Sequence, residues 1–165
     1  MRIGIIADTH DRIDAIESAV DVFERNDVFV VIHCGDIARP AMIPPFEPFE
    51  FHAVLGNNDE PYREELTAAI AELGSNSEFH GLFADLEFDG VRFAVTHGVV
   101  EDTIYEHAES GEYDYVLHGH FHEAKRSVVD GTVVINPGAH RSVVVLDTKT
   151  GNARFVPLEG VDTSR

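Results

Sequence analysis

The chain has 165 residues, 44% of them hydrophobic and 25% charged, which suits one globular domain spanning residues 1–165 with a proper core. Its formal net charge is −18, from 30 acidic and 12 basic residues, so it lacks the basic patch that a general binder of nucleic acid or anionic membranes requires. A single cysteine excludes an internal disulfide, and no apolar run resembles a signal peptide or reaches the roughly 20 residues of a membrane helix, so we expect a soluble cytoplasmic protein.

Two explanations of the acidity stay open. The chain is either an ordinary acidic enzyme or a halophilic protein, and its only lysines are Lys125 and Lys149. At high salt, screening weakens the repulsion between carboxylates, which also stay well hydrated. The halophilic explanation therefore predicts that the protein loses structure at low ionic strength.

The first half of the chain is predicted to alternate strands with helices. Continuous apolar runs predict buried strands at residues 3–7, 28–32 and 51–55. Their order around the first helix indicates a βαβ unit and a parallel sheet. The helices are expected from Ile13 to Phe23, capped by Asp11 or Asp14 and ended by Asn26, and from Pro61 to Leu73, ended by Gly74. The proline-rich residues 39–50 predict an irregular loop or short turns with buried phenylalanines.

The second half is predicted to be rich in hairpins. Asp89-Gly90, Asp130-Gly131 and the turn at residues 149–152 each separate two apolar runs, so we expect a largely antiparallel sheet there. A short helix at residues 102–108 and a strand at residues 113–117 lie between the first two hairpins. Residues 160–165 are expected to fray.

Polar residues whose oxygen or imidazole side chains can bind a metal ion follow these strands. They are Asp8, His10, Asp36, Asn57, His97, His120 and His122. Asp8 and His10 are one residue apart, and in an extended segment they would point to the same side and bind one ion. Oxygen and imidazole ligands without sulfur suit Mn²⁺, Fe, Zn²⁺, Co²⁺ or Ni²⁺ better than Ca²⁺ or Mg²⁺. Seven ligands exceed what one catalytic metal with open positions accepts, so we expect two ions sharing a carboxylate.

The order of these motifs resembles the calcineurin-like metallophosphoesterases, and is most similar to their small, stand-alone bacterial and archaeal phosphodiesterases. The motifs are D-x-H from Asp8, G-D at Asp36, G-N-x-D from Gly56, H-G at His97 and G-H-x-H from Gly119, and they are extended by Asn136-Pro137-Gly138. Each motif is weak alone, but all five in this order are a specific signal. The resemblance implies a four-layer α/β/β/α sandwich of two mixed sheets with flanking helices.

The resemblance also implies residue roles. Asp8, His10, Asp36 and His122 would hold one metal, and Asp36, Asn57, His97 and His120 a second, with Asp36 bridging. A metal-bridging hydroxide would attack phosphorus in line, since metal ions bring the pKa of bound water to about 7. Asp36, Asn57, Asn58 and His97 are the positions expected to act in catalysis, with the metals and Asn57 neutralising phosphoryl charge. Mn²⁺ is the expected metal, with Ni²⁺, Co²⁺, Fe²⁺ and Zn²⁺ as alternatives.

Two positions depart from the family pattern. Many members have a histidine at the position of Asn58, where it can protonate the leaving group. Because an amide cannot do so near pH 7, and general acid catalysis typically contributes ~10²–10⁴-fold, we expect esters with good leaving groups to be the better substrates. Phe121 stands where threonine is common, which we expect to change local packing only.

The remaining polar residues have less specific signals. We expect His33 and His118 to be satisfied core or supporting residues, and Asp59 to orient a ligand or cap a helix. The other histidines, His52, His80 and His107, are expected to be structural or exposed. His140 and Arg141 follow the Asn-Pro-Gly turn, and whether they contact substrate stays open.

Other functions also stay open. A scaffold with the same fold, a phosphomonoesterase and a nuclease are the alternatives to a phosphodiesterase. The acidity argues against binding of a nucleic-acid duplex, and homo-oligomer formation is undecided.

Overall fold

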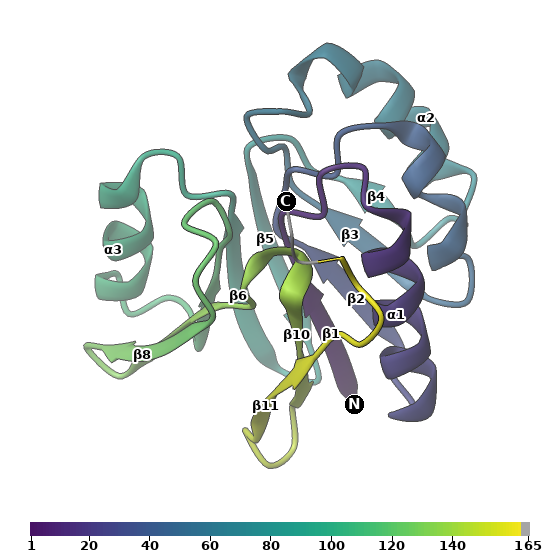
Figure 1. Cartoon of the computed structure of the whole chain (residues 1–165). Helices are drawn as coiled ribbons and strands as arrows, with labels where there is room; N and C mark the ends of the chain where they lie inside the picture. The colour runs from purple at the N-terminus through teal and green to yellow at the C-terminus, as the bar shows by residue number, and fades with distance from the viewer. Residues whose placement is uncertain (163–165) are drawn as a thin grey trace.

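Two mixed β-sheets face each other in the computed structural model, which describes residues 1–162 (Figure 1). The six-stranded sheet contains β1 (Arg2–Ile6), β2 (Val30–His33), β3 (Glu50–Ala53), β4 (Glu78–Phe79), β10 (Ser142–Asp147) and β11 (Ala153–Pro157). The five-stranded sheet contains β5 (Phe83–Phe88), β6 (Val91–Thr96), β7 (Tyr115–Leu117), β8 (Lys125–Val129) and β9 (Thr132–Asn136). The α-helices are α1 (Ile13–Arg25), α2 (Arg63–Ala71) and α3 (Glu101–Glu109).

Parallel pairing in the first sheet confirms the predicted βαβ unit. The strand order is β11-β10-β1-β2-β3-β4, and the four strands from β1 to β4 run parallel. Successive side chains of a strand point to opposite faces. Accordingly, Ile3 and Ile5 join the core between the sheets, whereas Ile6 packs on the side of α1.

The second sheet is more parallel than predicted. Its order is β5-β6-β7-β9-β8, in which the two hairpins are antiparallel but β7 pairs in parallel with both β6 and β9. The Asp-Gly turns do form hairpins, with positive φ at both turn residues. The third hairpin, β10–β11, pairs with β1 and so belongs to the first sheet. Turn residues determine local pairing but not which sheet a hairpin joins.

The helices complete four layers, as the fold class predicts. α1 and α2 cover the outer face of the first sheet, and α3 covers the outer face of the second, on the opposite side of the molecule (Figure 1). None of the helices between residues 1 and 162 combines the length and apolarity needed to cross a bilayer.

Local details differ from the predictions at several ends. Neither Asp11 nor Asp14 caps α1, since Arg12 holds that position without a side-chain cap, while Asn26 ends the helix as expected. Pro61 lies in a separate 3₁₀ turn, Glu60–Tyr62, ahead of α2.

Other loops match or extend the expectations. Residues 39–50 contain 3₁₀ turns at Pro40–Met42 and Pro44–Phe46, with Phe46 and Phe49 buried. The two-residue strand β4 was not predicted. In the segment expected to fray, residues 163–165 lie outside the described part, whereas the backbone N–H of Asp162 donates to the Asp14 carboxylate.

Candidate metal centre

The carboxyl ends of five strands meet at one edge of the two sheets. Asp8, Asp36 and Asn57 follow the neighbouring parallel strands β1, β2 and β3, and His97 and His120 follow the neighbouring strands β6 and β7. Backbone hydrogen bonds continue the pairing beyond the strands, from Asp8 N–H to the Gly35 carbonyl at 2.9 Å and from Gly119 N–H to the His97 carbonyl at 3.0 Å. Sheet register therefore places distant sequence motifs side by side.

Two carboxylates form the centre of the cluster. Asp8 Oδ1 lies 3.3 Å from His122 Nε2 and 3.8 Å from both His10 Nε2 and His97 Nε2. Asp36 Oδ2 lies 3.3 Å from His97 Nε2 and 3.8 Å from His10 Nε2. Asp8 with His10 and His122, and Asp8 with Asp36 and His97, form two overlapping groups whose atoms are close enough to hold an ion each.

The backbone at the cluster is strained. Asp8, His10, Asp36, His120 and His122 have φ of 53°, 43°, 61°, 69° and 55°, in the left-handed region. Such a conformation costs roughly 1–3 kcal/mol per non-glycine residue and occurs preferentially at functional sites. The sequence predicted an extended segment from Asp8 to His10. That prediction is wrong, because both residues have positive φ. The segment is a turn after β1, and this turn brings both side chains to the cluster.

Glycines in the motifs allow the close approach of the ligand side chains. A Cβ on Gly56 would lie 2.1 Å from Asp36 Oδ1, and one on Gly119 would lie 2.6 Å from Asp8 Oδ2. A Cβ on Gly35 would lie 2.7 Å from His97 Nδ1. The glycines of G-D, G-N and G-H therefore have a steric role beside the ligands.

The residues present fit divalent cations. Asp8 is 0% and Asp36 2% exposed, and the buried Asp8 Oδ1 has no hydrogen-bond donor among residues 1–162. Burial raises the pKa of Asp8, opposed by His97 and His122. Burial also tends to raise the pKa of Asp36. Hydrogen bonds from His97 and Asn58 outweigh this effect and hold the pKa of Asp36 well below the usual range. Removing a carboxylate from water costs several kcal/mol unless a cation compensates it, and oxygen plus imidazole is a transition-metal donor set.

His97 is oriented for ligation. Its Nδ1 lies 2.8 Å from the Cys34 carbonyl, which can only accept, so Nδ1 carries a proton and Nε2 faces the cluster. Asn57 Oδ1 lies 3.0 Å from that Nε2. Burial lowers the pKa of His97, but Asp36, Cys34 and Asp8 outweigh this effect and hold it above its ordinary value.

The expected ligand His120 is placed differently. Its backbone N–H donates to Asp8 Oδ2 at 3.0 Å, and its ring lies edge-on to His97, 5.2 Å between centroids. Its ring nitrogens belong to neither close group of acidic and histidine side chains. The structure therefore brings together Asp8, His10, Asp36, Asn57, His97 and His122, with His120 beside them.

Asp59 connects two of the motif loops through hydrogen bonds. Its buried carboxylate accepts from the backbone N–H groups of Asp36 and Gly56, both at 2.8 Å, and of Ala38 at 2.7 Å. Asp59 therefore orients the loop that carries Asp36, which was one of its two expected roles, and makes no side-chain cap.

His33 is a buried supporting residue, as expected. Gly35 N–H donates to His33 Nδ1 at 3.2 Å, which leaves Nε2–H to donate to Thr9 Oγ1 at 3.1 Å. Thr9 was missed by the sequence analysis, because a threonine between two ligands carries no distinctive signal. Burial, with smaller effects from neighbouring side chains, lowers the pKa of His33 to about 3.

Residues 1–151 match the Calcineurin-like phosphoesterase superfamily domain. The chain belongs to this superfamily. It is 34% identical to Phosphodiesterase MJ0936 of Methanocaldococcus jannaschii, with 96% of this chain and 100% of that protein covered. It is 25% identical to Probable metallophosphoesterase YsnB of Bacillus subtilis, with 97% of this chain and 93% of that protein covered. A solved structure of an archaeal phosphodiesterase superposes with a TM-score of 0.90 at 34% identity, with 96% of this chain and 100% of that chain covered.

Asn58 has a defined place in the site. Its backbone N–H donates to Asp36 Oδ1 at 2.9 Å, and its side-chain amide donates to Asp36 Oδ2 at 2.8 Å. Asn58 is nevertheless exposed to solvent. The position therefore holds an uncharged donor to a central carboxylate, at the open side of the calcineurin-like centre.

An apolar pocket of about 250 Å³ adjoins this centre at His97. Leu82, Val99 and Val100 line it and are 69%, 55% and 60% exposed. The pocket wall contains no carboxylate, although the chain has 30 acidic residues. Phe121, 46% exposed, lines a smaller pocket of about 160 Å³ beneath α3 together with His118 and Tyr105. Phe121 thus contributes a pocket wall beside the ligands, beyond the packing role expected for it.

Proposed function

We propose that this chain is a metal-dependent phosphodiesterase with a dinuclear centre. The observation that carries the proposal is the pair of overlapping ligand groups that share the buried Asp8. Membership of the calcineurin-like superfamily and the 34% identity to an archaeal phosphodiesterase support it.

The ligand assignment is part of the proposal. Asp8, His10, Asp36 and His122 would hold one ion, and Asp36, Asn57, His97 and His120 the other. Asp36 Oδ2 lies 3.8 Å from His10 Nε2 and 3.3 Å from His97 Nε2, which supports the bridging role, and Asp8 Oδ1 lies 3.8 Å from the same two nitrogens. When bound, two divalent ions, for which we propose Mn²⁺, supply Lewis acidity for the activation of water and for the neutralisation of phosphoryl charge.

The protein's own groups set the preference among esters. The amide of Asn58 donates to Asp36 and has no proton to give to a leaving group near pH 7. The apolar pocket at His97 offers an apolar surface to an organic ester group. For comparison, a cavity of about 150 Å³ accommodates benzene in another protein. Diesters with apolar or aryl groups and good leaving groups are therefore the proposed substrates.

Hydrolysis of bis-p-nitrophenyl phosphate tests the proposal. The protein should hydrolyse it with Mn²⁺ at high salt, and Asp36→Ala should abolish turnover. Asp102→Asn, at an exposed position of α3, is the matched control and should retain it. A screen with Mn²⁺, Ni²⁺, Co²⁺, Fe²⁺ and Zn²⁺ identifies the metal, and absence of turnover with all five would contradict an enzymatic role.

The alternatives are distinguished by the same preparation. A scaffold would bind metal without turnover, and a monoesterase would prefer p-nitrophenyl phosphate over the diester. The acidic surface disfavours a duplex nuclease. The exposed apolar side chains beside α3 are compatible with a homo-oligomer, which sedimentation at several concentrations would reveal. A cytoplasmic location, supported by the buried unpaired Cys34, is also proposed.

A further inference from the structure

His140 has buried hydrogen-bonding atoms without a partner. Both ring nitrogens are shielded from solvent, yet neither is hydrogen-bonded to any of residues 1–162. Native proteins pair most buried polar groups, so each exception calls for an explanation, such as a catalytic role or a bound water or ion. His140 lies in the short 3₁₀ helix η4 (Ala139–Arg141), between β9 and β10.

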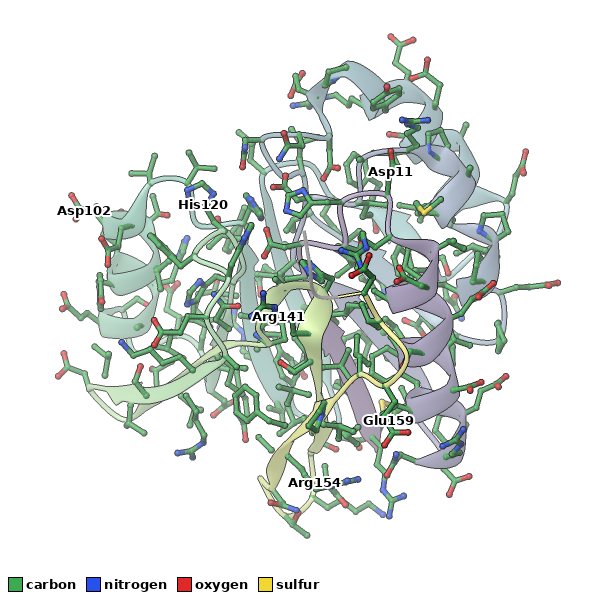
Figure 2. The ribbon with its side chains drawn as sticks, in the orientation of Figure 1. Asp11, Asp102, His120, Arg141, Arg154 and Glu159 are labelled. Atoms are coloured by element: carbon green, nitrogen blue, oxygen red, sulfur yellow. The ribbon has the colours of Figure 1, made fainter. Side chains whose placement is uncertain are left out.

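Arg141, the next residue, carries an exposed and unpaired guanidinium. Among the described arginines, only Arg126 and Arg141 make no ion pair or side-chain hydrogen bond. In a chain of net charge −18, most arginine side chains find an acidic partner, so a free guanidinium beside His140 is unusual. Figure 2 shows Arg141 on the short helix that precedes β10.

The turn before His140 is tied to the metal centre. The Asn136 side chain donates to the Gly119 carbonyl at 3.2 Å and accepts from Gly138 N–H at 3.0 Å. It thereby links η4 to the loop that carries His120 and His122. Gly138, with φ of 93°, turns the chain at no steric cost, and Ala139, with φ of 46°, is strained where the chain enters η4.

The electrostatic environment of His140 is cationic. Burial lowers the pKa of His140, and the nearby guanidinium groups of Arg12 and Arg141 lower it further, while His10 and His122 are its other titratable neighbours. His140 is therefore neutral near pH 7, with one N–H donor and one acceptor. A donor without a partner, next to a free guanidinium and near two candidate metal ligands, suits an oxyanion.

We propose that Arg141, together with His140 once a turn of its ring exposes a nitrogen, binds a phosphoryl oxygen of the substrate or of the phosphate product, beside the His10–His122 side of the metal centre. The guanidinium supplies charge and two parallel donors, and the His140 N–H supplies a third. This inference rests on the proposed phosphoesterase function. It adds a cationic, anion-binding side to the centre, in contrast to the apolar pocket at His97.

Inorganic phosphate is the probe. Its inhibition constant against diester hydrolysis, and its calorimetric dissociation constant for the Mn²⁺-loaded protein, should rise about tenfold in Arg141→Gln, the size expected for one lost charged hydrogen bond. Arg141→Lys should restore part of the affinity. Arg126→Gln, which removes the other unpaired arginine, should change neither constant.

His140→Leu separates binding from structure. The apolar side chain removes the unpaired nitrogens, so the metal-free protein should melt at an equal or higher temperature while phosphate affinity falls and KM rises more than kcat changes. A lower melting temperature with unchanged phosphate affinity would mean that His140 is structural. Unchanged phosphate constants in both variants would overturn the inference even if the protein hydrolyses diesters. Phosphate binding that depends on Arg141, without any hydrolysis, would support the anion site and contradict the proposed function.

Discussion

Asn58 donates two hydrogen bonds to Asp36, one from its backbone N–H to Oδ1 at 2.9 Å and one from its side-chain amide to Oδ2 at 2.8 Å. Asn58 is thus hydrogen-bonded to a carboxylate of the ligand group that Asp36 forms with Asp8 and His97. Both oxygens of Asp36 are oriented by a neutral neighbour, which lowers the pKa of Asp36 without adding a titrating group.

The first prediction concerns the leaving group. Asn58→His should raise the turnover of alkyl phosphodiesters relative to aryl phosphodiesters, by at least about tenfold, because general acid catalysis typically contributes ~10²–10⁴-fold where the leaving group is poor. The ratio of kcat/KM for a methyl and a p-nitrophenyl ester measures it. Equal changes for both esters would show that the histidine does not protonate the leaving group.

The second prediction concerns Asp59. Asp59→Asn keeps one acceptor oxygen, which can still serve the N–H groups of Asp36 and Gly56, but turns a donor toward the N–H of Ala38 or, flipped, toward the other two. The free energy of unfolding should fall by about 1–3 kcal/mol, the cost of buried unpaired groups. Denaturant unfolding of the metal-free protein measures the change. The exposed Asp102→Asn should stay within about 0.5 kcal/mol of the parent, and an equal loss in both variants would contradict the role of Asp59.

The third prediction concerns Gly56. Gly56→Ala places a Cβ 2.1 Å from Asp36 Oδ1, so Asp36 must move and metal loading should fall at least tenfold. The matched control is Gly111→Ala, where φ is 75° and no heavy atom lies within 4 Å of the added Cβ. That control should lose about 1 kcal/mol of stability from backbone strain while keeping its metal content. Metal analysis after gel filtration distinguishes the variants, and full loading of Gly56→Ala would refute the steric argument.

The fourth prediction concerns acid stability. The pKa of the buried His33 is lowered to about 3, while an unfolded histidine titrates near pH 6.5. Between these values the unfolded chain binds more protons, so the stability contributed by neutral His33 is complete above about pH 6.5 and is lost as the pH falls, by up to about 1.4 kcal/mol per unit.

His33→Asn tests this pH dependence. Its side-chain oxygen can accept from Gly35 N–H as His33 Nδ1 does, but it does not titrate. Unfolding of the metal-free protein between pH 7 and pH 5 should therefore show a shallower slope for the variant than for the parent. Parallel slopes would contradict the assignment to His33.

The fifth prediction concerns salt. Acidic residues including Glu17, Asp21 and Glu47 surround a groove of about 910 Å³ between α1, the proline-rich loop and the end of β11. Their repulsion is screened at high ionic strength, so the far-UV circular dichroism of a halophilic protein should diminish on dilution below about 0.1 M salt, where the screening length exceeds about 10 Å. An unchanged spectrum would leave the acidity as that of an ordinary enzyme.

Periodicity and motif spacing in the sequence alone determined the strands that carry the site, the α-helices and six of the side chains that come together at the centre. These features are local or depend on a strand ending where polar residues begin, as at Asp8, Asp36 and Asn57. The Asp-Gly hairpins could be predicted because only such residues adopt both positive φ values of the turn readily.

Only the tertiary structure decided how these pieces are joined. The parallel insertion of β7 between β6 and β9, and the pairing of β10 with β1, depend on contacts between residues far apart in sequence. The left-handed turn at Asp8–His10 and the placement of His120 beside rather than within the ligand groups also follow from packing of whole loops. The unpaired nitrogens of His140 belong to the same category, because the lack of a partner depends on every residue around it, which no local pattern records.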